Sequence, residues 1–110
     1  MAMPVPPDRA RAVAAARFRA LGDETRIRLL EQLTAGERNV GELMELMGLG
    51  QSLISHHLRS LREAGLVRDR RDGRWVYYSI AGQALAATRL TIYELEPLTS
   101  GDAERTSDYQ

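Results

Sequence analysis

Apolar residues recur at every third or fourth position through the first 64 residues, a spacing that predicts amphipathic helices. Four helices are expected in succession, over residues 8–21, 24–34, 39–47 and 51–64. Asp23 and Asn39 stand at the expected starts of the second and third helices, where a short polar side chain caps the first amide groups. Glu42, three residues after Asn39, completes a capping-box pattern.

The pattern changes between residues 66 and 80, where apolar and polar positions alternate as they do in β-strands. We expect strands over 66–70 and 75–80, with a hairpin tip at Arg71-Asp72-Gly73 because Asp-Gly suits left-handed turn positions. A last helix over 82–96 ends before Pro97. The order ααααββα predicts one small, mostly helical α+β domain.

The two ends of the chain differ from this middle part. Residues 1–7 are rich in proline and predict an extended arm, whereas residues 98–110 are polar and acidic and predict a disordered tail. The domain is therefore expected over residues 8–97. A chain of 110 residues suffices for one domain with a modest core, so a partner is expected to contribute to stability.

The composition excludes several kinds of chemistry. The chain has no cysteine, which excludes disulfides, thiolate metal sites and thiol redox sensing. Its only histidines, His56 and His57, are adjacent, so a site with several histidine ligands is hard to build. No nucleophile–base pair or phosphate-binding loop is visible, which argues against an enzyme. No signal peptide or membrane-length apolar run is found, so a cytoplasmic protein without membrane contact is expected.

The charge is balanced overall but unevenly distributed. Fifteen arginines and no lysines face 15 acidic residues. Residues 51–74 carry six arginines against three acidic residues, whereas residues 31–50 carry one arginine against four glutamates. One basic segment therefore lies next to an acidic one, which keeps nucleic-acid binding open despite the zero net charge.

The third and fourth helices are joined by the short turn Gly48-Leu49-Gly50, the spacing of a helix-turn-helix. On the fourth helix, apolar residues share one face and small or polar residues lie nearly opposite, at about 100° per residue. The apolar residues are Ile54, Leu58 and Leu61, and the polar ones are Ser52, Ser55, His56 and Arg59, with Gln51 at the start. Such a face can read base edges in a major groove. A solvated helix face is the alternative.

The expected hairpin carries arginines along its length, at positions 68, 70, 71 and 74. A basic hairpin next to a recognition helix is typical of a wing that contacts the DNA backbone or minor groove. Charged residues that only keep a sheet edge from aggregating are the alternative.

Three stretches resemble the ArsR/SmtB family of winged-helix repressors: ALGDETRIRLL at 20–30, QSLISHHLRSLREAGLV at 51–67 and RDGRWVYYS at 71–79. They lie within a match over about residues 12–96. The resemblance implies a winged helix-turn-helix that dimerises through its first and last helices and binds a palindromic operator in double-stranded DNA.

The resemblance also assigns roles by position. The implied base-reading residues are Gln51, Ser52, Ser55 and His56. The implied backbone and wing contacts are Arg59, Arg62, Arg70, Arg71 and Arg74. The implied dimer interface contains Val13, Ala14, Phe18, Leu85, Ile92 and Leu95.

Many members of this family release DNA when they bind a metal. The positions that match the thiolate site hold Asn39, Val40 and Gly41, and those that match the Asp/His site hold Gly82, Ala84, Leu95 and Leu98. Neither set can ligate a metal through its side chains as the family does, so no metal or cofactor is expected. The effector is then a small organic molecule, or the protein responds only to its own concentration.

Two alternatives stay open. A carboxylate metal site near the C-terminus could use Glu94, Glu96, Asp102, Glu104 and Asp108, and it would favour hard cations. A winged-helix module that binds another protein, and never DNA, is the second.

Overall fold

The computed structural model describes residues 7–98, and residues 1–6 and 99–110 lie outside the described part. The described residues form five helices and three short strands. The elements are α1 (Pro7–Leu21), α2 (Glu24–Leu33), β1 (Arg38–Asn39), α3 (Val40–Met47), α4 (Gln51–Glu63), β2 (Val67–Asp72), β3 (Trp75–Ile80) and α5 (Gly82–Leu95). The predicted helix order is confirmed, and most predicted bounds agree to within one or two residues.

Local chemistry explains where the helices begin and end. Asp23 accepts a hydrogen bond from the amide of Arg26 at 3.1 Å and so caps α2. Asn39 and Glu42 form the predicted reciprocal capping box at the start of α3, with distances of 2.8 and 2.9 Å. Gly48 ends α3 at a φ of 67°, a left-handed conformation that glycine adopts without the steric penalty of a Cβ atom.

The strands form one antiparallel sheet in the order β1-β3-β2. The sequence pattern did not predict β1, which pairs with β3 through only two residues, Arg38 opposite Tyr78 and Asn39 opposite Tyr77. The hairpin tip also lies further along than predicted. Asp72 pairs with Trp75, so Gly73 and Arg74 form the turn, with a φ of 61° at Gly73 as in a type II′ turn.

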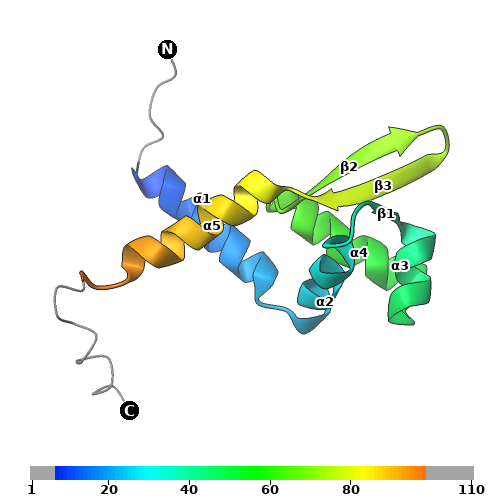
Figure 1. Cartoon of the computed structure of the whole chain (residues 1–110), viewed down its shortest axis with the longest axis horizontal. Helices are drawn as coiled ribbons and strands as arrows, with labels where there is room; N and C mark the ends of the chain where they lie inside the picture. Colours follow the sequence, from blue (N-terminus) through cyan, green and yellow to red (C-terminus); the bar gives the residue numbers. More distant parts are fainter. Residues whose placement is uncertain (1–6, 99–110) are drawn as a thin grey trace.

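The core lies where α2, α3 and α4 pack against one another and against the start of β2. Its largest fully buried side chains are Leu29, Leu43, Ile54, Leu58, Leu61 and Leu66. Figure 1 shows that α1 and α5 cross at one end of the molecule, away from α3 and from the projecting hairpin of β2 and β3. The helix-turn-helix and the hairpin therefore share one end, and the first and last helices form the other.

Four arginines connect the helices by donating to backbone carbonyls near the C-termini of neighbouring elements. The pairs are Arg26 Nε to Ala20 O at 2.7 Å, Arg38 Nε to Gln32 O at 3.3 Å, Arg28 Nη2 to Met47 O at 3.4 Å and Arg17 Nε to Ala64 O at 3.4 Å. Each guanidinium sits where a helix leaves its last carbonyls without amide partners and where its dipole favours a cation. These four contacts join α1, α2, α3, α4 and β1.

Candidate nucleic-acid interface

Helix α4 divides into a buried and an exposed side, as its sequence predicts. Ile54, Leu58 and Leu61 have at most 1% of their surface exposed and fix the helix against the core. Gln51, Ser52, His56 and Arg59 are exposed on the other sides of the helix, and Ser55 is half-buried. The predicted base-reading residues therefore lie on the outside of a rigidly packed helix, where a DNA groove could reach them.

The two histidines have different surroundings. His56 is exposed, whereas His57 is buried and retains 7% of its surface. Burial lowers the pKa of His57 below its ordinary value, the Asp23 carboxylate acts in the opposite direction, and Arg26 and His56 lower the pKa further. Only His56 is thus placed to contact a ligand, and His57 is a packing residue.

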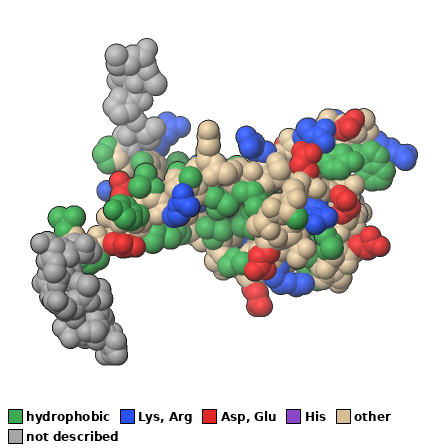
Figure 2. Space-filling view, in the orientation of Figure 1, with side chains coloured by type: hydrophobic (Ala, Val, Ile, Leu, Met, Phe, Trp, Pro, Cys, Tyr) green, Lys and Arg blue, Asp and Glu red, His purple; other side chains and the backbone are tan. Residues whose placement is uncertain are grey.

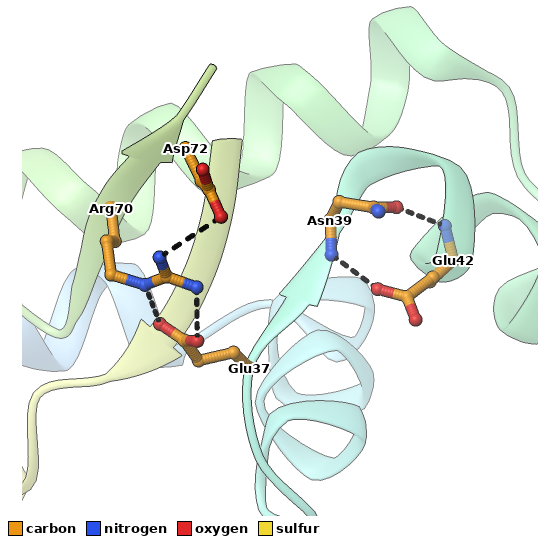
Figure 3. A network of polar contacts seen from close by, with 5 residues as sticks. All are labelled: Glu37, Asn39, Glu42, Arg70 and Asp72. Carbon is orange, nitrogen blue, oxygen red and sulfur yellow. Dashed lines mark hydrogen bonds and ion pairs between the residues drawn. The ribbon is translucent and has the colours of Figure 1, made fainter. Parts of the chain in front are cut away.

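Arg70 and Arg62 already have carboxylate partners within the chain. Arg70 donates to Glu37 through Nε at 3.0 Å and through Nη2 at 2.9 Å (Figure 3). Its guanidinium also lies 5.0 Å from the centre of the Tyr77 ring. Arg62 pairs with Asp69 at 3.1 Å. These two predicted DNA contacts are the ones whose charge is already compensated.

The Glu37–Arg70 pair perturbs both groups. The hydrogen bonds from Arg70 lower the pKa of Glu37, and the same contacts raise the pKa of Arg70. Sequence reasoning missed Glu37 because it stands 33 residues from its partner and before a strand that the pattern did not predict. Arg70 is consequently a link between the hairpin and the segment that precedes β1.

Arg59, Arg71 and Arg74 are exposed and form no ion pair with a carboxylate of residues 7–98. Arg74 occupies the hairpin turn, with its guanidinium 5.4 Å from the centre of the half-exposed Trp75 ring. The ring restricts the guanidinium without neutralising it. Arg68 on β2 is likewise exposed and without an ion pair among residues 7–98, so the uncompensated charge near α4 comes from the helix itself and from the hairpin.

A second surface lies at the opposite end of the molecule. Ile92, Tyr93 and Leu95 of α5 have 51, 68 and 77% of their surface exposed, and Figure 2 shows hydrophobic side chains over this region. Among the predicted interface residues, Val13, Ile92 and Leu95 are exposed, and Ala14, Phe18 and Leu85 are half-buried. Because large aliphatic side chains are rarely gathered on a surface that faces only water, this strip is suited to bury itself against another surface.

Residues 7–98 contain no group of three or more histidine or carboxylate side chains placed to hold a metal ion. Glu94 and Glu96 lie at the end of α5, whereas the other members of the alternative carboxylate site, Asp102, Glu104 and Asp108, lie outside the described residues. No described helix has the length and apolar character needed to cross a bilayer.

Comparison with known proteins gives a match to the part of the chain that contains the helix-turn-helix. A family profile described as "Bacterial regulatory protein, arsR family" matches residues 23–69, which span α2 to the start of β2. The transcriptional repressor SdpR of Bacillus subtilis is 36% identical over 63 residues, which are 57% of this chain and 70% of SdpR. This chain belongs to the ArsR family.

Other ArsR-family proteins agree with this assignment. The arsenic resistance transcriptional regulator ArsR1 of Pseudomonas putida is 47% identical over 64 residues, 57% of this chain, and the chain spans about half (50%) of ArsR1. The crystal structure of a possible transcriptional regulator for arsenical resistance superimposes with a TM-score of 0.70 at 35% identity, covering 86% of this chain and 97% of that one. The predicted winged helix-turn-helix fold is therefore confirmed.

Proposed function

We propose that this ArsR-family protein is a homodimeric repressor that binds a palindromic operator in double-stranded DNA. The observation that carries the proposal is the exposed polar side of α4, rigidly backed by Ile54, Leu58 and Leu61 and adjacent to a hairpin with uncompensated arginines at its tip. Gln51, Ser52, Ser55 and His56 supply the short donors and acceptors that read base edges in a major groove.

The remaining arginines hold the DNA backbone in this proposal. Arg59 on α4 and Arg71 and Arg74 on the hairpin contact phosphates or the minor groove, because their charge has no carboxylate partner among residues 7–98. Arg62 and Arg70 contribute less, since each must leave an existing ion pair before it can bind a phosphate.

Two observations support dimerisation. Helix α5 carries an exposed apolar strip, and it crosses α1 at the end of the molecule away from the hairpin (Figure 1). We propose that Val13, Ala14, Phe18, Leu85, Ile92 and Leu95 meet their counterparts in a second copy. Two copies related by a two-fold axis would present two α4 helices to half-sites about 34 Å apart, the repeat of one DNA turn.

The proposed effector is not a thiophilic metal. ArsR1 is named for arsenic resistance, but soft metals and metalloids prefer thiolate ligands and this chain has no cysteine. We propose that DNA release depends on a small organic molecule or on protein concentration alone, and that the protein acts in the cytoplasm.

The deciding experiment selects a duplex from a random library with the protein treated with EDTA, and then measures its affinity by fluorescence anisotropy against random DNA. The proposal expects binding at least about 1,000-fold tighter to the selected duplex. Addition of Zn(II), Ni(II) or Mn(II) afterwards should leave the affinity unchanged.

Two results would contradict parts of this proposal. Release of the DNA on addition of one of these metals would contradict metal independence. It would favour a metal site that includes the C-terminal carboxylates. Binding that ignores sequence would favour a module that recognises another protein.

A further inference from the structure

Arg26, in the first turn of α2, contacts two other helices through one side chain. Its Nε donates to Ala20 O at 2.7 Å and its Nη2 to Arg19 O at 3.4 Å, both at the C-terminus of α1. Its Nη1 lies 3.4 Å from Nδ1 of His57, on the buried side of α4. The end of α1 and the middle of α4 are thus joined through a single guanidinium.

The geometry defines the state of the His57 ring. A guanidinium is only a donor, so Nδ1 of His57 must accept, and the ring must be neutral with its proton on Nε2. The charged and titratable groups around it are Asp23 and Arg26 from the start of α2 and His56 from α4 itself. A protonated His57 has no lone pair for Arg26 and places a second positive charge against it.

We propose that Arg26 and His57 are positioning residues that hold α4 at a fixed place relative to α1. This inference rests on the proposed function, in which α1 and α5 join two copies and each α4 reads one half-site. The distance between the two reading helices then depends on how α4 is attached to the dimerising end within each copy. Arg17, which donates to Ala64 O at 3.4 Å, holds the C-terminus of α4 to α1, and the Arg26–His57 contact holds its middle.

This role has a consequence for pH. The low pKa of His57 keeps the ring neutral at pH 7 and above, and acid breaks its contact with Arg26 once the ring takes up a proton. Discrimination between operator spacings should therefore decline as the pH falls below the ordinary histidine range. The overall affinity for DNA should change in the opposite direction. It should rise as the pH falls, because added positive charge strengthens the attraction to phosphate.

The test uses the full chain and three forms of the selected duplex, with its own spacer between half-sites and with one base pair added or removed. Anisotropy titrations at pH 7.5 compare the wild type with His57→Leu, which keeps burial but removes the acceptor. His57→Asn is the matched control, because its amide oxygen can accept near the Nδ1 position and does not titrate. Unfolding curves measure the folded fraction of each protein.

We expect His57→Leu to lose about tenfold of the wild-type preference for the original spacer, the scale of one hydrogen bond to a charged group. His57→Asn should keep this preference as the pH is lowered from 7.5 to below the ordinary histidine range, whereas the wild type should lose it once His57 takes up a proton. A purely structural loss would instead weaken binding to all three duplexes by one factor.

Unchanged spacer preference in His57→Leu, or identical pH profiles of the wild type and His57→Asn, would overturn the inference. If His57→Leu does not fold, Arg26→Gln and the two pH profiles decide the question. Failure of the wild type to select any duplex is a different outcome, because it removes the proposed function and the inference with it.

Discussion

Arg70 and Glu37 form a two-pronged ion pair, with nitrogen–oxygen distances of 3.0 and 2.9 Å, that ties the hairpin to the segment before β1 (Figure 3). Arg70 lies opposite Tyr77 on β3, and Asn39 of β1 pairs with the same Tyr77 from the other side. The ion pair thus joins β2 to the residue before β1, across the middle strand of the sheet. It also occupies an arginine that the sequence pattern and the family resemblance would assign to DNA.

The salt dependence of DNA binding should separate the two kinds of hairpin arginine. Arg74→Ala should reduce the slope of log affinity against log salt by about one phosphate contact, roughly 0.9. Arg70→Ala should reduce it by less than half as much, because its charge is already balanced by Glu37. Anisotropy titrations at four salt concentrations measure both slopes. Equal reductions would show that Arg70 leaves Glu37 when DNA binds.

Base reading by α4 predicts a loss of discrimination without a general loss of affinity. Ser55→Ala and His56→Ala should each lower the preference for the selected duplex over random DNA by about 1–3 kcal/mol. Ser60→Ala is a suitable control, because Ser60 Oγ donates to His56 O within the helix at 3.3 Å. Discrimination that survives both changes would mean that another element reads the sequence.

The apolar strip on α5 predicts a dimer that one charge can disrupt. Ile92→Glu should give a monomer in sedimentation experiments, because a carboxylate buried at the interface would lose its hydration without a partner. Leu46→Glu is a matched control, since Leu46 on α3 is 50% exposed and Ile92 is 51% exposed. A dimer that persists in Ile92→Glu would place the interface elsewhere.

The turn between α3 and α4 offers a test of backbone conformation. Gly48 has a φ of 67° and space for a Cβ atom, so Gly48→Ala should lower the free energy of unfolding by about 1–2 kcal/mol through strain alone. Gly50, the N-cap of α4 with a φ of −77°, has similar space. Gly50→Ser should raise the free energy of unfolding by only a few tenths of a kcal/mol, because glycine is itself a fair N-cap residue and serine adds a side-chain cap. Denaturant unfolding measures both, and a neutral Gly48→Ala would show that the turn relaxes.

Much of the fold follows from the sequence because its signals are local. Asn39 and Glu42 mark a helix start within four residues, and the spacing of Ile54, Leu58 and Leu61 identifies the buried side of α4. The two-residue strand β1 carries no alternation of its own, so only its pairing with β3 reveals it. The turn at Gly73 and Arg74 likewise depends on strand register, which a local Asp-Gly signal placed one residue too early.

Less of the candidate site than of the fold could be predicted from the sequence. The exposed side of α4 could be predicted from helical periodicity, and the polar residues lie where that periodicity puts them. The separate roles of the arginines could not be predicted in this way. Arg26, Arg62 and Arg70 are distinguished only by partners that lie outside their own helix or strand. Ala20 O, Asp69 and Glu37 distinguish them, and their contacts form only when the chain is folded.

The arginines that hold helix C-termini differ from the exposed ones in how they respond to ionic strength. Dissolved ions screen exposed charges far more than partly buried ones. The contacts of Arg17, Arg26, Arg28 and Arg38 with backbone carbonyls are partly buried, whereas Arg71 and Arg74 are exposed. Rising salt should therefore detach the protein from DNA while its helices stay joined. The released protein then keeps its DNA-binding surface assembled and can bind again.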